Sequence, residues 1–270
     1  MSMISNETEL ATLLLRVLEQ YRNSSEFFAT YELPEYRAIE SLKLEGRELA
    51  LFLTFGSVTN HIHNETGNSK KTDGENGLWR VSERLWKNHS WLFKPEELVG
   101  EAQKDRLKDV LADEDIMDSR DPNWWYTNAK TLYNDYDSDP RELLAAHDYV
   151  APEIETTVQG HGFPGFGGGG KVRSLWLRFM HEEVHQLDRI EEIPIPADFH
   201  IVALTNRFGG TDYDSRNKDD REAVKQYWEL ICAKHDFIPV EIDKPLWLLN
   251  KYWDPDGRQY IDEELEAIRS

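Results

Sequence analysis

The segment FPGFGGGGKVRSLWLRFMHEEVHQLDRIEEIPIPADFHIVALTNR spans residues 163–207. A turn saturated with glycine leads into an amphipathic run that begins at Lys171. Apolar residues at helical spacing predict one buried face on that run, made of Val172, Leu175, Trp176, Phe179 and Met180. A second apolar helical run, 199–206, follows Asp198, and an aspartate at such a place is a common N-cap. The segment therefore predicts two helices, each beginning beside a residue that can carry chemistry.

The sequence on either side also has the pattern of helices. Apolar residues at helical spacing predict helices over 9–21, 47–61, 78–88, 104–111, 123–136 and 218–234. Residues 6–8, beginning with Asn6, are the candidates to cap the first of these helices. The 47–61 run is apolar nearly all round, which is typical of a central, buried helix. Almost no stretch alternates with the period of two that half-buried strands require. The fold class we predict is all-α.

Composition narrows the classes of function. The chain has 270 residues, enough for a substantial core, and no apolar run approaches the roughly 20 residues that span a membrane. Its start, MSMISNETEL, lacks the features of a secretion signal, and the lone Cys232 excludes an internal disulfide and an all-cysteine metal cluster. We expect a cytoplasmic protein. The net charge of −20 argues against unspecific binding to polyanions.

Three interpretations of the glycine-rich turn are open. Residues 165–171 fit GxxxxGK, the start of a nucleotide-binding P-loop, but Val172 stands where Ser or Thr would ligate Mg²⁺ and no buried strand precedes the turn. The turn can also be a flexible connector. In the third interpretation its glycines let backbone amides approach a DNA phosphate, and the positive end of the next helix adds to the attraction. Such a site needs few cationic side chains, so it suits an acidic chain.

A second motif, HExxH, is formed by His181, Glu182 and His185. In zinc hydrolases two histidines one helical turn apart bind the metal, and the glutamate acts as a base. Here a charged residue, Glu183, follows the first glutamate, and no third ligand follows at a familiar spacing. The histidines also fall opposite the apolar face of their helix. We therefore expect solvated histidines rather than a zinc site.

The turn and the aspartate segment together resemble the helix-hairpin-helix DNA glycosylase superfamily. Its members carry a hairpin of the type LPGVGxK and then a V-D-x-H-[IV] segment that opens the next helix. The residues that match are Pro164, Gly165, Gly167 and Lys171 in the hairpin, and Asp198, His200, Ile201, Asn206 and Arg207 in the aspartate segment. Compared with the family pattern, the hairpin holds more glycines, and the segment between the lysine and the aspartate is longer than in most members.

The resemblance implies a two-lobe helical fold. The central lobe is expected over 47–148. The second lobe would combine 1–46 with 149–270 and carry both the helix-hairpin-helix, at about 155–180, and the aspartate segment. The hairpin and the aspartate would then line a cleft between the lobes.

The resemblance also implies an activity: excision of a damaged or modified base from double-stranded DNA by base flipping. Lys171 stands at the lysine that bifunctional members use as nucleophile. It would attack C1′ of the deoxyribose and, as a Schiff base, promote strand cleavage by β-elimination. Asp198 would stabilise the developing sugar cation or help to deprotonate the nucleophile. The expected enzyme is thus a bifunctional DNA glycosylase and AP lyase.

Further roles follow from the same resemblance. DNA contacts are expected at Gly165, Gly167, Gly168, Gly169, Gly170 and His200. The candidates to stack on the flipped base or to fill its gap are Trp124, Trp125 and His161, with core packing as the alternative for each tryptophan. Some members hold an iron–sulfur cluster near the C-terminus, but with Cys232 alone we expect neither a cluster nor another metal, apart from a monovalent cation at the hairpin carbonyls. We expect a monomer.

Two alternatives use the same residues differently. An N-glycosidase of this fold could act on a nucleoside, a nucleotide or an RNA base, which suits the acidic composition better than duplex DNA does. A non-enzymatic DNA-binding module would use only the hairpin. The identity of the base is open, because the pocket is built by side chains that the pattern does not place.

Overall fold

The computed structural model describes residues 3–60, 62–63, 68–69, 77–114, 119–160, 162–168 and 170–270. Helices dominate this part of the chain, and one short hairpin pairs Ile62 with Ser69 and His63 with Asn68. The all-α prediction is confirmed. None of the helices in these ranges combines the length and the apolar character that crossing a membrane requires.

The chain divides into two compact units, Pro34–Ile190 and Met1–Leu33 with Glu191–Ser270. The larger unit contains α2 (Pro34–Leu42), α3 (Gly46–Val58), β1 (Ile62–His63), β2 (Asn68–Ser69), α4 (Leu78–His89), η2 (Ser90–Phe93), α5 (Pro95–Leu98), α6 (Glu101–Ala112), α7 (Asp121–Asp135), α8 (Pro140–Ala145), α9 (Ala151–Gln159), α10 (Lys171–Phe179) and η3 (Met180–Val184). The smaller unit contains α1 (Glu7–Arg22), η1 (Glu26–Ala29), α11 (Phe199–Gly209), α12 (Lys218–His235), α13 (Pro239–Lys251), η5 (Trp253–Gly257) and α14 (Arg258–Arg269). The short turn η4 (Ile190–Glu192) lies where the chain passes from one unit to the other.

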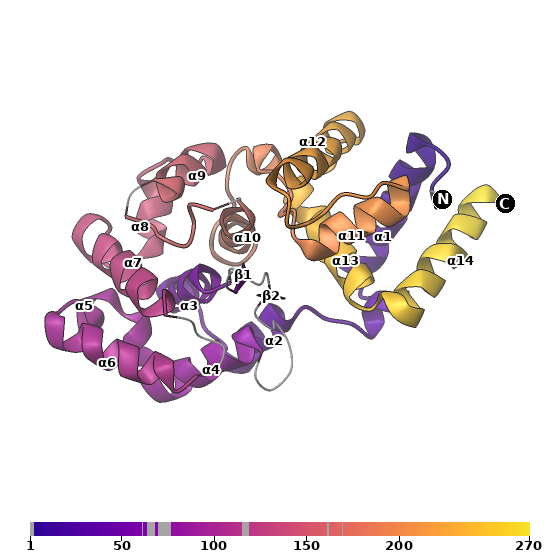
Figure 1. Cartoon of the computed structure of the whole chain (residues 1–270). Helices are drawn as coiled ribbons and strands as arrows, with labels where there is room; N and C mark the ends of the chain where they lie inside the picture. The colour runs from indigo at the N-terminus through magenta and orange to yellow at the C-terminus, as the bar shows by residue number, and fades with distance from the viewer. Residues whose placement is uncertain are drawn as a thin grey trace. The chain divides into compact units, whose positions relative to one another are not determined.

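Helix α3 is the centre of the larger unit. Every residue from Leu49 to Val58 is buried, and the helix contacts α4, α7, α8 and α10 (Figure 1). Aromatic rings fill the space around it, as where Phe55 stacks on Trp125 with ring centroids 5.0 Å apart. A helix that is apolar on all sides can bury all of them only if other helices surround it. The predicted central helix is therefore confirmed. It spans Gly46–Val58, whereas the sequence predicts 47–61.

The smaller unit is a group of helices around α13. Helix α11 packs against α13, while α1 contacts α13 and α14. Asn6 caps α1 by accepting from the Glu9 amide at 3.0 Å, as its place before the helix predicts. The two ends of the chain lie side by side in this unit, where Arg269 Nη2 donates to the Met3 carbonyl at 2.8 Å (Figure 1). The unit is thus closed by contacts between its first and last residues.

These boundaries differ from the lobes that the sequence predicts. The larger unit includes not only 47–148 but also α2 and the whole of 149–190. The reason is packing, because α10 contacts both α3 and α9. The glycine-rich turn and Lys171 consequently belong to the larger unit, whereas Asp198 belongs to the smaller one. The prediction that the hairpin and the aspartate share a lobe is corrected.

A buried ion pair joins α10 to α2 inside the larger unit. Arg178 Nη2 donates to Glu35 Oε1 at 2.8 Å, and the two side chains are only 2% and 7% exposed. Burial raises the pKa of the Glu35 carboxyl, and the Arg178 guanidinium opposes that rise. A buried carboxylate and a buried guanidinium can be tolerated as a pair. Removing one of them leaves the other as an uncompensated buried charge, which lowers the stability of the fold.

We expect Glu35→Ala to destabilise the larger unit by about 3 kcal/mol, because it takes a carboxylate away from a buried guanidinium. The double variant Glu35→Leu, Arg178→Met should regain most of that loss. Asp105→Ala, which breaks an exposed pair with Lys108 at 3.0 Å, is the control and should cost less than about 1 kcal/mol. Urea unfolding followed by circular dichroism measures all three. Equal effects of Glu35→Ala and Asp105→Ala would contradict the assignment.

Candidate functional site

The glycine-rich turn connects two helices of the larger unit. Helix α9 ends at Gln159 and α10 begins at Lys171, so residues 160–170 form the connection. Two predicted site residues, His161 and Gly169, lie outside the described residues. A helix, a turn and a second helix follow one another here, from Ala151 to Phe179, in the region where the sequence predicts the helix-hairpin-helix at about 155–180.

The carbonyl oxygens of the turn are hydrogen-bonded to side chains of the same unit. Asn128 Nδ2 donates to the Pro164 carbonyl at 2.8 Å, and Thr131 Oγ1 donates to the Gly162 carbonyl at 2.7 Å. From the other side, Arg173 Nη1 donates to the Phe166 carbonyl at 2.6 Å. Helix α7 and the first turn of α10 thereby hold the turn in one conformation. The turn is an anchored element, which argues against the flexible connector.

Individual glycines of the turn have different reasons to be glycine. Gly165 has φ = +95°, and a Cβ there would lie 3.0 Å from the Val58 carbonyl oxygen. A Cβ at Gly168 would meet nothing within 4 Å. Gly165 is therefore required by the fold of the larger unit. Gly168 leaves its backbone open to approach from outside, which is what a backbone that binds a phosphate needs.

The start of α10 is suited to binding an anion. Its N-cap is Gly170, in the left-handed conformation with φ = +87°, and a glycine has no side chain that could accept from the first amides. The first amide groups of a helix have no partner within the helix, and they form the positive end of its dipole. Lys171, the first residue of α10, is half-buried and adds a cationic side chain at the same end. An anionic group bound at this turn would meet both attractions.

Trp124 and Trp125 have opposite surroundings although they are adjacent. Trp125 is fully buried, and its Nε1 donates to the Leu92 carbonyl at 2.6 Å. Trp124 is half-buried; a Cβ at Gly165 would lie 3.3 Å from its ring, and the guanidinium of exposed Arg120 lies 5.1 Å from its ring centroid. For Trp125 the structure supports the core-packing alternative, which corrects its place among the base-pocket candidates. Trp124 lies beside the glycine-rich turn.

Asp198 is held rigidly at the start of α11 in the smaller unit. Its Oδ1 accepts from the His200 amide at 2.8 Å and from the Ile201 amide at 3.1 Å. The predicted N-cap is confirmed. The side chain of His200 is half-buried, with Nδ1 2.9 Å from Asn250 Nδ2, and Asn250 in turn accepts from Arg207. Two matched residues of the predicted aspartate segment, His200 and Arg207, thus share one partner on α13.

The HExxH motif does not form the helical pair that zinc binding requires. Helix α10 ends at Phe179, a π-helical turn spans Met180–Val184, and His185 is extended (φ −159°, ψ 133°). The ring of His185 stacks on Tyr149 with centroids 3.9 Å apart. Across the part of the chain that the structure describes, no group of three His, Cys, Asp or Glu residues is placed to hold a metal ion.

The single cysteine lies in the interior of the smaller unit. Cys232 on α12 is 1% exposed, and burial, with the Glu229 carboxylate adding to it, raises the pKa of the thiol to about 12. A thiol of this kind stays protonated at neutral pH and does not act as a nucleophile. Cys232 therefore contributes packing rather than chemistry.

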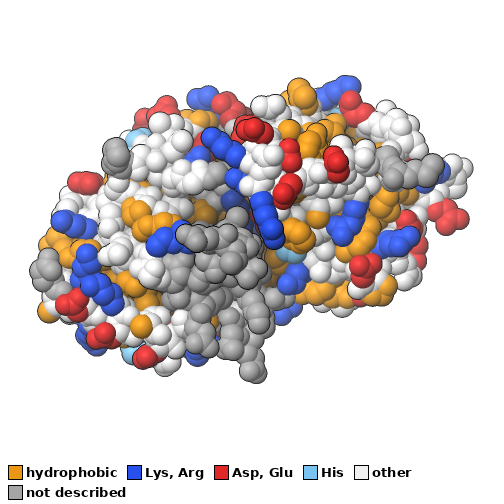
Figure 2. Space-filling view, in the orientation of Figure 1, with side chains coloured by type: hydrophobic (Ala, Val, Ile, Leu, Met, Phe, Trp, Pro, Cys, Tyr) orange, Lys and Arg blue, Asp and Glu red, His pale blue; other side chains and the backbone are white. Residues whose placement is uncertain are grey.

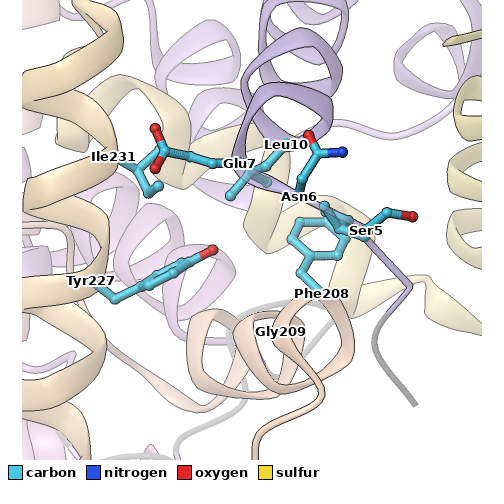
Figure 3. A pocket seen from close by; sticks show the side chains of 9 residues that line it. Ser5, Asn6, Glu7, Leu10, Phe208, Gly209, Tyr227 and Ile231 are labelled. Atoms are coloured by element: carbon cyan, nitrogen blue, oxygen red, sulfur yellow. The ribbon is translucent and has the colours of Figure 1, made fainter.

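One hollow of the smaller unit, about 280 Å³, lies away from the predicted site (Figure 3). It is lined by Ile4, Ser5, Asn6, Glu7, Leu10, Phe208, Gly209, Tyr227 and Ile231. Phe208 and Gly209 end α11, so the hollow lies at the opposite end of that helix from Asp198. Burial, with the charge of Glu7 adding to it, raises the pKa of the Tyr227 phenol, which stays a hydrogen-bond donor. No predicted site residue lines this hollow.

No protein-family model matches the chain, and none of the curated proteins matches it.

Several residues of this site were missed by sequence reasoning. Asn128 and Thr131 hold the turn from α7, a helix predicted only by its apolar pattern. No sequence pattern marks these two residues. Only a physical argument points to them, because a turn packed on helices needs donors for its buried carbonyls. Arg173 has a signal of its own, since a charged residue inside a buried helical segment needs partners.

The contrast between Gly165 and Gly168 is testable. Gly165→Ala should lower the stability of the larger unit by about 1–3 kcal/mol, because alanine is strained at this φ and its Cβ presses on Val58. Gly168→Ala, in open space, should change stability by less than about 0.5 kcal/mol. Thermal unfolding of the two variants compares them directly. Equal losses would mean that the turn is not anchored as described.

Proposed function

We propose that the protein is a DNA glycosylase that removes a damaged or modified base, with AP lyase activity. The observation that carries the proposal is the turn between α9 and α10. Its carbonyls bond to Asn128, Thr131 and Arg173, and α10 begins at a glycine N-cap, Gly170. Backbone amides at the start of a helix can hold a phosphate, and this is the role that we propose for the start of α10.

The proposal assigns roles to two residues. Lys171 begins α10 in the larger unit, whose turn would bind the DNA backbone, and Asp198 caps α11 in the smaller unit. The resemblance of the hairpin and of the aspartate segment to helix-hairpin-helix DNA glycosylases supports this division of roles. The two matched segments occur in the order that the family has, and each lies at a helix start.

The proposed chemistry begins with a nucleotide turned out of the duplex. The Lys171 amine attacks C1′, the N-glycosidic bond breaks, and the base leaves with a proton. The C1′–O4′ bond then opens, O4′ takes up the proton that the amine loses, and C1′ becomes doubly bonded to the lysine nitrogen. The resulting iminium acidifies C2′, so loss of a C2′ proton and of the 3′ phosphate cleaves the strand. Asp198 stabilises the positive charge that builds on the sugar, and the two amides that hold Oδ1 keep its carboxylate in one orientation.

One observation favours a second candidate, an N-glycosidase acting on a nucleoside, a nucleotide or an RNA base. The net charge is −20, and basic and acidic side chains are interspersed on the face that Figure 2 presents. Long duplexes are normally bound by clustered basic residues. Base release from single nucleosides, with none from any duplex, would decide for this candidate.

The role of Lys171 can be tested by trapping. Wild-type protein incubated with borohydride and duplexes that contain an abasic site or one of a panel of damaged bases should form a covalent adduct. Lys171→Ala should abolish the adduct, because the amine is the nucleophile. Lys108→Ala removes an exposed lysine of the same unit and should leave the adduct unchanged. An adduct that survives Lys171→Ala would assign the nucleophile elsewhere, and no adduct on any duplex would exclude the lyase.

The role of Asp198 can be separated from its cap. Asn caps helices about as well as Asp, so Asp198→Asn should keep α11 folded while removing the negative charge. We expect base release to fall about 100-fold or more, a size typical of losing a positioned carboxylate. Single-turnover base release, with thermal unfolding as the check on folding, measures both. If Asp198→Asn releases base at the wild-type rate, the carboxylate has no part in the chemistry.

A further inference from the structure

A large apolar side chain stands in water next to the proposed catalytic carboxylate. Phe199 is the first residue of α11, directly after Asp198, and it is 60% exposed. Nothing in the packing of the smaller unit requires a phenylalanine here, because most of its ring makes no contact with protein. A polar residue would serve a helix start equally well. Single exposed apolar residues are common on protein surfaces, so the case for a role in binding rests on the groups that surround Phe199.

The ring of Phe199 is backed by other rings rather than isolated. It meets the His200 ring edge to face, with centroids 5.4 Å apart. His200 in turn lies 4.7 Å from the ring of Trp247 on α13. These three side chains form an aromatic row, Phe199–His200–Trp247, that runs from solvent to the half-buried Trp247. Because the Asp198 cap fixes the helix start, the outermost ring is presented from a rigid base.

Cationic groups accompany the aromatic row. Lys251 Nζ lies 5.8 Å from the centroid of the Trp247 ring. Arg207, which bonds to the same Asn250 as His200, has its guanidinium 4.5 Å from the centroid of the Trp253 ring. Aromatic rings interleaved with cations are typical of surfaces on which nucleic-acid bases stack. The occupant that this surface fits is therefore a base rather than a hydrophobic protein partner.

We propose that Phe199 inserts into the base stack of duplex DNA beside the nucleotide on which Asp198 acts, an inference that rests on the proposed glycosylase function. Turning a nucleotide out of a duplex leaves a gap between its neighbours. An apolar side chain that enters the step compensates for the lost stacking. Insertion of Phe199 breaks no contacts in the protein interior, because its ring is already in solvent. The inserted ring favours the flipped state and makes no contact with the reacting bond.

The experiment compares duplex with single-stranded substrate. Phe199→Ala should slow single-turnover base release from a paired duplex about 10- to 100-fold, the size of losing one base–aromatic stack. Release from the same lesion in single-stranded DNA, where no base stack has to open, should change less than about 3-fold. Phe199→Trp, which keeps a large ring, should retain most of the duplex activity. Leu230→Ala, which removes a 73% exposed apolar side chain of the same unit, is the matched control and should change neither.

A binding readout separates this inference from the proposed function. A duplex with 2-aminopurine next to an abasic site should show a fluorescence change with wild-type protein and with Leu230→Ala, but not with Phe199→Ala. Equal loss on duplex and single strand, or an unchanged fluorescence response in Phe199→Ala, would overturn the insertion while leaving the glycosylase in place. If wild-type protein releases no base and gives no fluorescence response, both the function and the insertion fail. A response without base release would keep the insertion and remove the glycosylase.

Discussion

The larger unit depends on one constraint, which is that the turn between α9 and α10 must bury its backbone against helices without losing hydrogen bonds. The Pro164 and Phe166 carbonyls face side chains of α7 and α10, and Asn128 and Arg173 supply the donors. A buried carbonyl without a donor would cost about 1–3 kcal/mol. The conformation of the turn is thus set by the fold of the larger unit.

The smaller unit solves a comparable problem with a side chain. Helix α11 begins at an N-cap whose carboxylate accepts two amide hydrogen bonds, so Asp198 both stabilises the helix and is oriented by it. Its neighbour Phe199 does the opposite, since it stabilises little and is left in water. The two neighbouring residues at the start of this helix therefore contribute differently to its stability. The fold explains the aspartate, whereas Phe199 makes few contacts within it, and we assign it a role only through the proposed insertion into DNA.

Much of the fold could be predicted from the sequence, because helical periodicity depends on local contacts. The buried face of α10, the central place of α3 and the caps at Asn6 and Asp198 all follow from spacing and residue type. What could not be predicted depends on packing between distant residues. The assignment of the hairpin to the larger unit rests on α10 contacting α3 and α9. The difference between Trp124 and Trp125 rests on which of two neighbours faces the core, and the early end of α10 on a π-helical turn that no pattern announces.

An acidic protein that binds DNA must do so locally. With a net charge of −20, attraction over long distances opposes approach to a duplex, so affinity has to come from groups in contact. Backbone amides serve this purpose, because the positive end of α10 acts within its first turn and is independent of the overall charge. A stacking ring serves it as well, since base–aromatic contact involves no net charge. In the proposed function, the turn and the exposed Phe199 would therefore supply the two kinds of contact that remain effective on an acidic surface. Recognition would then rest on a distorted nucleotide rather than on the length of the duplex.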